Sequence, residues 1–207
     1  MAKNVFISFR FADGYKYKEE LAKLFSESED TVDFSEDQDR SGLSDETIRR
    51  YLYGKLSRSS ITIVILTPQA VNHQKNIWGQ YSDWMYDEIR YSLEDRGYNR
   101  TNGLIAVYVP EAEKYILEKT SHYCDICQKT SSVINVKQFD NLVFKNMMNV
   151  KLNYKKNKCY NIYDANYDSF CSLISYEDFK NNFSEYIEIA SEKRENRNKY
   201  NVKAHMQ

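Results

Sequence analysis

A glutamate occupies an unusual position in the segment YSDWMYDEIRYSLED, residues 81–95. The apolar residues of this segment recur at every fourth position, as Met85, Ile89 and Leu93. That spacing predicts a helix with one face on a hydrophobic core, and Glu88 borders this face one turn after Trp84. A carboxylate at the edge of a core costs desolvation free energy, so its charge is expected to have a use. Beside an aromatic ring it suits a ligand with a cationic ring or a sugar diol, and an ordinary ion-paired glutamate is the alternative.

Two other ligand chemistries lack their motifs. The chain has no GxG and no GK[ST], so the Rossmann and P-loop interpretations have no support. A phospho-acceptor receiver domain would place acidic residues after its first strand and an aspartate at the end of its third. The corresponding strands here end in SFRFAD and LTP, which argues against that interpretation as well.

The four cysteines lie in the second half of the chain. His122, Cys124 and Cys127 have the short spacing of zinc ligands, and Cys159 and Cys171 follow downstream. The downstream pair lacks the close CxxC spacing of a strong zinc motif, so Cys124 and Cys127 are only weak zinc candidates. We therefore expect no metal, and thiols in a loop-rich segment.

The overall composition argues against a nucleic-acid or membrane partner. Lys and Arg number 29 while Asp and Glu number 30, which gives no net field for nucleic acid or an anionic membrane. The longest apolar run, ITIVIL at 61–66, is far shorter than the roughly 20 residues that span a bilayer. The start, MAKNVFISF, lacks a signal-peptide cleavage pattern. We expect a cytoplasmic protein with reduced cysteines.

Strand and helix patterns alternate through the first half of the chain. The expected strands cover residues 3–9, 31–34, 60–68 and 103–110. The expected helices cover residues 14–25 and 81–95, with another that Ser44 caps. Strands separated by helices predict right-handed βαβ units and an open parallel sheet, here an α/β domain over residues 1–118. Ligands bind such sheets at the carboxyl ends of the strands, near which the Glu88 helix should begin.

The second half, residues 119–207, is expected to pack on this domain as an extension. Residues 119–175 are polar, contain all four cysteines and show no clear periodicity. Two short runs in it, SSVINV at 131–136 and NLVF at 141–144, are candidate edge strands. From Ser175 onward a helical apolar face returns and predicts a terminal helix.

Three motifs resemble those of TIR domains. They are KNVFISFR at 3–10, SITIVILTP at 60–68 and Ser82-x-Trp84-x3-Glu88, in that order. The nearest resemblance is to the TIR-like proteins of Thoeris, a bacterial antiphage system, and it covers about residues 3–118. It implies a flavodoxin-like α/β fold, an open parallel sheet flanked by helices, to which this chain adds a loop-rich extension and a terminal helix. It also implies cleavage of NAD⁺ at the nicotinamide–ribose bond.

The resemblance assigns roles residue by residue. Glu88 corresponds to the catalytic glutamate. The residues at positions that correspond to substrate binding are Ser8, Phe9, Arg10, Phe34, Ser35, Ser82 and Trp84. NAD⁺ is then the substrate, and no cofactor is implied. The polar segment after residue 118 departs from a minimal TIR domain, so the shape of the outer pocket and a homo-oligomer are left open.

The chemistry of NAD⁺ cleavage suits a single carboxylate. Nicotinamide is a cationic leaving group that departs neutral, so it needs no general acid, whereas a typical glycosidase needs two carboxyl groups. One carboxylate can stabilise an oxocarbenium-like centre and orient the ribose hydroxyls. Water as the acceptor gives ADP-ribose, and another hydroxyl or nucleophile gives a cyclic or conjugated product.

We therefore expect a TIR enzyme of antiphage defence that makes a cyclic or conjugated ADP-ribose signal. That signal would reach a separate effector protein by diffusion. Two alternatives are a non-catalytic TIR module that signals by assembly and a related nucleoside or deoxynucleotide N-glycosidase.

Overall fold

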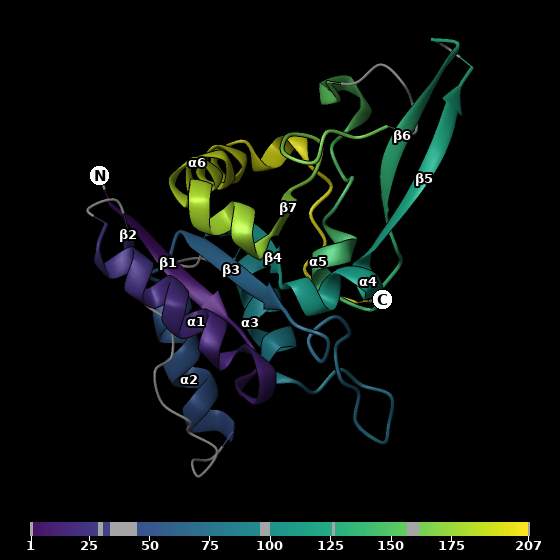
Figure 1. Cartoon of the computed structure of the whole chain (residues 1–207). Coiled ribbons are helices and arrows are strands. Elements are labelled where there is room, and N and C mark those ends of the chain that lie inside the picture. The colour runs from purple at the N-terminus through teal and green to yellow at the C-terminus, as the bar shows by residue number, and fades with distance from the viewer. Residues whose placement is uncertain are drawn as a thin grey trace.

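A five-stranded parallel sheet forms the centre of the protein (Figure 1). The computed structural model describes residues 2–28, 31–33, 45–95, 100–125, 127–156 and 162–206. The strands are β1 (Lys3–Ser8), β2 (Thr31–Asp33), β3 (Ile61–Leu66), β4 (Gly103–Tyr108) and β7 (Cys171–Ser175), in the spatial order β2-β1-β3-β4-β7. Each neighbouring pair in this order is parallel, which confirms the expected open α/β sheet.

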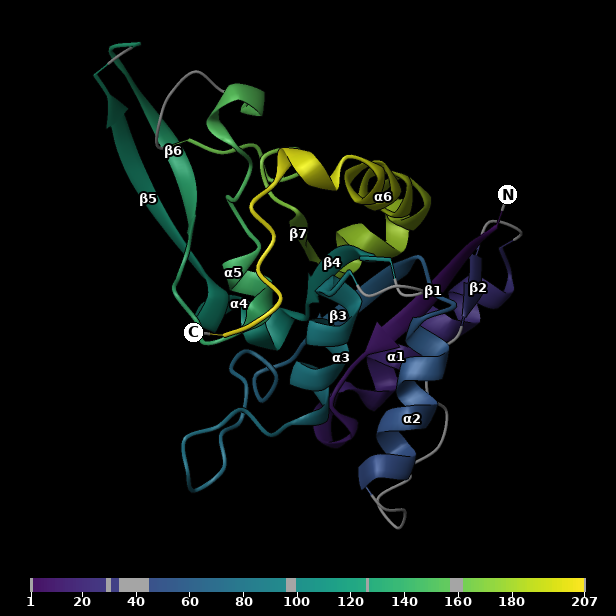
Figure 2. The ribbon, with the colours of Figure 1, turned by 180° about the vertical axis from the view of Figure 1, so that it is seen from behind.

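Helices cover both faces of the sheet. The long ones are α1 (Phe11–Ser26), α2 (Asp45–Leu56), α3 (Trp84–Leu93) and α6 (Tyr176–Glu195). On one face α1 meets α6, where the ring centroids of Phe25 and Phe179 are 6.4 Å apart. On the other face α2 meets α3, where Tyr53 stacks on Tyr91 with centroids 4.0 Å apart (Figure 2). The arrangement confirms the predicted flavodoxin-like fold.

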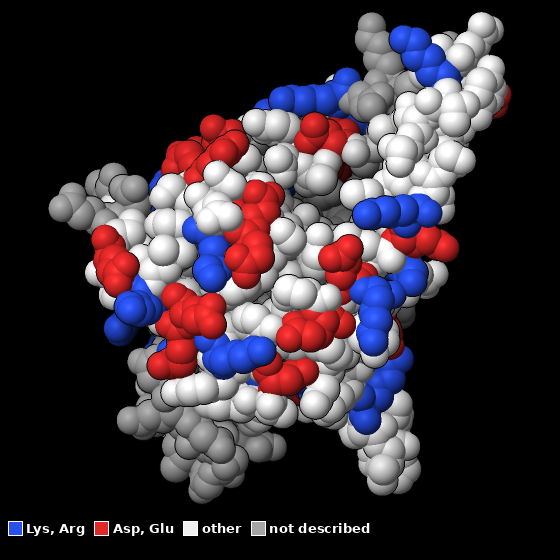
Figure 3. Space-filling model, in the orientation of Figure 1, with Lys and Arg blue, Asp and Glu red and all other residues white. Residues whose placement is uncertain are grey.

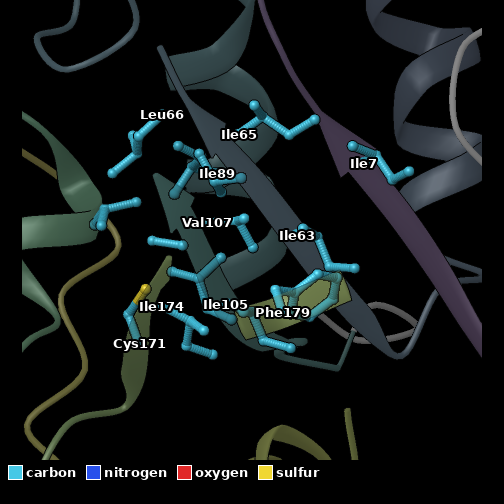
Figure 4. Close-up of a cluster of buried hydrophobic side chains, with 14 of the residues drawn as sticks. Ile7, Ile63, Ile65, Leu66, Ile89, Ile105, Val107, Cys171, Ile174 and Phe179 are labelled. Atoms are coloured by element: carbon cyan, nitrogen blue, oxygen red, sulfur yellow. The ribbon is translucent and has the colours of Figure 1, made fainter. Parts of the chain in front are cut away.

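The central strands are buried on both sides, which explains their continuous apolar sequences. Every residue of β3 is buried, and so are the first five residues of β4. Figure 4 shows Ile63 and Ile65 of β3 beside Ile105 and Val107 of β4, with Phe179 of α6 near Ile63 and Ile105. Removal of this apolar surface from water is the main favourable contribution to folding.

The sheet is completed from the far end of the chain. β7 pairs with β4 in a register that sets Leu104 opposite Cys171. α6 follows β7 directly, as the predicted terminal helix, and packs over β4. At the closest approach a Cβ on Gly103 would lie 2.4 Å from the carbonyl oxygen of Ala190. The sheet therefore crosses the boundary that the sequence led us to expect at residue 118.

An antiparallel hairpin precedes β7 where the sequence showed no clear periodicity. The short helix α4 (Glu113–Ile116) leads into β5 (Leu117–Cys124), which pairs with β6 (Lys129–Val136). The hairpin projects from the body of the protein (Figures 1 and 2). The run SSVINV lies in β6 and is a strand as expected.

The prediction of a strand at NLVF is wrong. These residues lie at the short helix α5 (Leu142–Lys145), which Asn141 caps by accepting a hydrogen bond of 2.9 Å from the backbone N–H of Val143. Four helical residues are too few to show a helical period, so an apolar run of this length reads equally well as a strand.

Short 3₁₀ helices complete the secondary structure at Pro110–Ala112, Leu152–Tyr154 and Arg197–Lys199. Ser44, the predicted cap of α2, lies outside the described residues. In the part of the chain that the structure describes, every helix is too short or too polar to cross a bilayer.

Candidate active site

Ser8 and Glu88 meet at the carboxyl end of β1. Ser8 is the last residue of β1 and is fully buried, and its Oγ donates a hydrogen bond of 2.6 Å to Oε2 of Glu88. Glu88 is 8% exposed, so its carboxylate lies at the margin of the core, as the sequence pattern predicted. An ionised carboxylate only accepts hydrogen bonds, and the Ser8 hydroxyl is a matching donor. Two of the predicted site residues thus come together from segments 80 positions apart.

Helix α3 positions Glu88 through its apolar face and through a serine one turn later. The apolar residues Met85, Ile89 and Leu93 are buried, as predicted. The Oγ of Ser92 donates a hydrogen bond of 2.8 Å to the carbonyl oxygen of Glu88 and lies 2.8 Å from Oγ1 of Thr62 in β3. These contacts hold the turn that carries Glu88 against the sheet.

The two residues after Ser8 have different surroundings. Nη2 of Arg10 lies 3.1 Å from Oδ2 of Asp83, the residue immediately before α3. Phe9 packs instead toward α1, with its ring centroid 4.8 Å from that of Phe11. Because successive side chains of an extended segment alternate in direction, Ser8 and Arg10 share the side of α3 and Phe9 does not. Of the three residues at 8–10 that the resemblance assigns to substrate binding, two therefore lie beside the Glu88 helix.

Trp84, the first residue of α3, is 36% exposed and is not part of the core. The guanidinium carbon of Arg49 lies 5.9 Å from the centroid of a Trp84 ring, within the range of a cation–π contact. Ser82 is exposed as well, whereas Phe34 and Ser35 lie outside the described residues. The motif that predicted the site therefore pairs an accessible indole with a nearly buried carboxylate.

Two hollows in the described surface are not lined by Glu88. One of about 650 Å³ lies along the hairpin, where His122 and Tyr163 line it. The other, of about 520 Å³, lies at the start of α1, where Tyr15 and Thr67 line it. The site is therefore assigned from the chemistry of a nearly buried carboxylate with a directed partner, and not from cavity volume.

Sequence reasoning missed Asp83 and His73, which lie beside the Glu88 helix. Asp83 caps α3 by accepting a hydrogen bond of 2.6 Å from the backbone N–H of Tyr86. An aspartate directly before a periodic apolar run is a known start signal, so Asp83 could have been found. Nδ1 of His73 lies 3.4 Å from Oδ1 of Asp83. No local pattern indicates that contact, because a loop separates the two residues.

The described cysteines lie on or beside strands β5 and β7 and not on the Glu88 helix. Cys124 ends β5 and is buried, Cys127 follows it and is exposed, and Cys171 is buried in β7. Burial raises the pKa of Cys171 to about 12, so this thiol is protonated at neutral pH. Cys159 lies outside the described residues. Within the described ranges, no three His, Cys, Asp or Glu side chains are grouped so that they could hold a metal ion.

Charges of both signs are interspersed over the face shown in Figure 3. Lys and Arg side chains lie next to Asp and Glu, and the whole chain has a formal net charge of −1. This face therefore offers no extended field of one sign to a polyanion.

The sequence also matches a known family. A family model described as the TIR-like domain of the Thoeris protein ThsB matches residues 6–114, just over half of the 207-residue chain. The matched range includes Ser8, Glu88 and the whole of α3. It ends before the hairpin, β7 and α6.

Proposed function

We propose that this chain, which belongs to the TIR-like domain family of the Thoeris protein ThsB, cleaves NAD⁺ at the nicotinamide–ribose bond. The family is that of a TIR module of antiphage defence. In the proposed reaction Glu88 is the catalytic residue, and the product is a cyclic or conjugated ADP-ribose.

The observation that supports this proposal most directly is the hydrogen bond between Ser8 and Glu88. It places a directed carboxylate at the carboxyl end of β1, the edge at which open α/β sheets bind nucleotides. Because Ser8 is buried at the end of a strand, the carboxylate is oriented before any substrate arrives. Such preorganisation is worth most where a positive charge develops in the transition state.

The proposed reaction breaks the bond between C1′ of the ribose and the nitrogen of nicotinamide. The bonding electron pair moves to that cationic nitrogen, so nicotinamide leaves neutral and takes no proton. Glu88 stabilises the positive charge that develops on the ribose and accepts hydrogen bonds from its hydroxyls. An acceptor oxygen or nitrogen then bonds to C1′ and releases its proton to Glu88 or to solvent.

The acceptor determines the product. Glu88 is only 8% exposed, so few water molecules can reach the carboxylate once a nucleotide covers it. Exclusion of water favours an acceptor on the same molecule or on a second bound nucleophile. The product would then be a diffusible nucleotide that carries the signal to a separate effector protein.

The test measures nucleotides in cells and in the purified protein. Cells that express the wild type or Glu88→Gln are sampled during phage infection, and NAD⁺, nicotinamide and ADP-ribose products are quantified by mass spectrometry. Purified protein is incubated with NAD⁺ and, in parallel, with nucleoside monophosphates. We expect nicotinamide release from NAD⁺ and a new ADP-ribose product in the wild type alone.

Two results would contradict the proposal. Equal NAD⁺ and nicotinamide levels in infected wild-type and Glu88→Gln cells would favour a TIR module that signals by assembly. Release of a free base from the monophosphates, with NAD⁺ untouched, would identify an N-glycosidase of another substrate class.

A further inference from the structure

Asp83 joins three segments of the chain at the start of the Glu88 helix. Its Oδ1 accepts a hydrogen bond from the backbone N–H of Tyr86, and its Oδ2 accepts one from the backbone N–H of Gln74. The same Oδ2 lies 3.1 Å from Nη2 of Arg10, and only 8% of the Asp83 side chain is exposed. The cap of α3 is therefore held from the end of β1 and from the preceding loop at once.

The charge state of Asp83 matches these contacts. Burial by itself would raise the pKa of this carboxyl, but His73 and the two backbone N–H groups outweigh that effect and lower the pKa below its usual range. Asp83 is thus an anion at neutral pH, and it lies at the N-terminal end of α3, where the helix dipole stabilises a negative charge.

His73 connects Asp83 to a segment beyond the matched family range. Nε2 of His73 accepts a hydrogen bond of 3.2 Å from the backbone N–H of Leu142, the first residue of α5. An imidazole that accepts a hydrogen bond at Nε2 and is neutral carries its proton on Nδ1. The Nδ1–H group of His73 therefore faces Asp83, with 3.4 Å between Nδ1 and Oδ1. His73 is buried, with its ring edge-on to Tyr86 at 5.2 Å between centroids.

The same segment holds the loop that leads to α3. The backbone N–H of His73 donates to the carbonyl oxygen of Asp140 at 2.8 Å, and the backbone N–H of Asp140 donates to Oδ1 of Asn72 at 2.7 Å. Nδ2 of Asn141 donates to the carbonyl oxygen of Val71 at 3.3 Å. Residues 140–142 therefore form a clamp on residues 71–73, although they lie outside the range that matches the family.

Together these contacts form two parallel connections between β1 and α3. Ser8 bonds Glu88, and Arg10 bonds Asp83. On the basis of the proposed NAD⁺ chemistry, we infer that Asp83 is a positioning residue for Glu88 and that His73 couples it to the clamp at 140–142. Loss of the Asp83 charge would leave the Ser8 hydrogen bond and the helix cap in place but weaken the contacts of Oδ2 with Arg10 and Gln74, and with them the placement of α3 and of the Glu88 carboxylate.

Asp83→Asn is the first test, because asparagine caps a helix as well as aspartate does. We expect a folded protein whose kcat for NAD⁺ falls by about tenfold or more while KM changes little, as expected when a catalytic group is misplaced. Tyr81→Phe is the matched control. It removes a hydrogen bond of 2.7 Å to Oδ1 of Asp140 in the same clamp without touching Asp83, and it should keep the wild-type kcat.

Two substitutions of His73 separate positioning from simple packing. Asparagine retains an N–H near the place of Nδ1, facing Asp83, while glutamine retains an acceptor near the place of Nε2, facing Leu142. We expect His73→Asn to keep most of the wild-type kcat and His73→Gln to lose it. If both variants lose stability and keep kcat in the folded fraction, or if Asp83→Asn turns over NAD⁺ at the wild-type rate, the inference is wrong.

A second readout does not depend on activity. Hydrogen–deuterium exchange at the amide of Gln74, which donates to Oδ2 of Asp83, should be faster in Asp83→Asn and His73→Gln than in the wild type and Tyr81→Phe. Unchanged exchange in both variants would overturn the positioning role. An inert wild type in infected cells would overturn the proposed reaction instead, and exchange would then decide the structural part separately.

Discussion

The hydroxyl of Ser8 donates a hydrogen bond of 2.6 Å to Oε2 of Glu88, across 80 positions of sequence. One partner ends a buried strand, and the other sits at the edge of an amphipathic helix on the neighbouring face. The carboxylate is thereby fixed by the tertiary structure and not by its own helix alone.

Glu88→Gln should keep the fold and abolish the chemistry. Glutamine has nearly the same shape and retains an oxygen that can accept from Ser8, but it cannot stabilise a positive ribose. We expect the melting temperature to change by only a few degrees and NAD⁺ turnover to fall by about 10²-fold or more. Both are measured on one preparation, together with protection of cells against phage. Turnover at the wild-type rate would show that another residue carries the reaction.

Ser8→Ala should weaken both the site and the fold. Without this hydroxyl, the nearly buried carboxylate loses a directed donor, which costs about 1–3 kcal/mol of unfolding free energy. Turnover should fall as well, because the carboxylate is no longer oriented. Ser60→Ala is a control, since Ser60 donates to the carbonyl oxygen of Asn4 at 3.1 Å and does not contact Glu88. Equal turnover of NAD⁺ in the two variants would show that Ser8 does not contribute to the site.

Trp84→Phe should affect substrate binding more than stability. Because the indole is 36% exposed, its replacement is expected to change the unfolding free energy by only about 0.5 kcal/mol. A smaller ring offers less surface to a nucleotide, so KM for NAD⁺ should rise. Denaturant unfolding and steady-state kinetics on the same sample check this. An unchanged KM would show that Trp84 does not contact the substrate.

Lys193 should make stability rise with pH. Its Nζ donates a hydrogen bond of 2.6 Å to Oγ of Ser172, and burial lowers its pKa to about 8 from 10.5. Between these values the unfolded chain binds the proton more tightly than the folded one, so the unfolding free energy rises with pH, by up to about 3 kcal/mol. Lys193→Met should remove this rise.

The comparison for Lys193 needs a restricted pH window. As the pH rises through 9, the thiol of Cys171 ionises in the unfolded chain but not in the folded one, because burial raises its pKa to about 12, and this loss of stability offsets the rise from Lys193. Urea unfolding of the wild type and Lys193→Met at pH 7.5, 8.25 and 9 isolates the lysine. Parallel curves for the two proteins would contradict the prediction.

Gly103→Ala should destabilise the fold, whereas Gly54→Ala should not. The added methyl group at Gly103 would meet the backbone of Ala190 in α6, which cannot yield as a side chain can, so a loss of about 1–3 kcal/mol is expected. Among the described residues, no atom beyond the chain neighbours and the nearby backbone of α2 lies within 4 Å of a Cβ at Gly54, where alanine should add about 0.4–1 kcal/mol. Urea unfolding measures both, and equal effects would mean that α6 does not press on β4.

The sheet up to β4 and the position of Glu88 could be predicted from local patterns. β3 and β4 are continuous apolar runs because both faces are covered, and α3 shows a clear four-residue spacing. The hairpin could not be predicted as readily, because most residues of β6 are exposed and its side chains show no alternation of burial. Periodicity reports burial, so a strand without a buried face leaves no such signal.

The partners of Asp83 depend on contacts that local patterns do not contain. His73 reaches Asp83 only because residues 140–142 hold its loop, and Arg10 reaches it only because β1 ends beside α3. Arg10 and Asp83 are 73 positions apart, and a loop separates His73 from Asp83. The types of these residues alone are common on any protein surface. Tertiary packing, not composition, selects them.

The late position of β7 has a consequence for synthesis of the protein. β4 has the sequence GLIAVY and obtains its second neighbour only when residues 171–175 have left the ribosome. Until then the growing chain exposes a row of unpaired backbone groups beside an apolar strand, which is a template for aggregation. The polar residues between β4 and β7 delay the pairing of these two strands, and the edge of β4 stays exposed meanwhile. A chain that stops before β7 should therefore accumulate as insoluble material, however complete its Glu88 site.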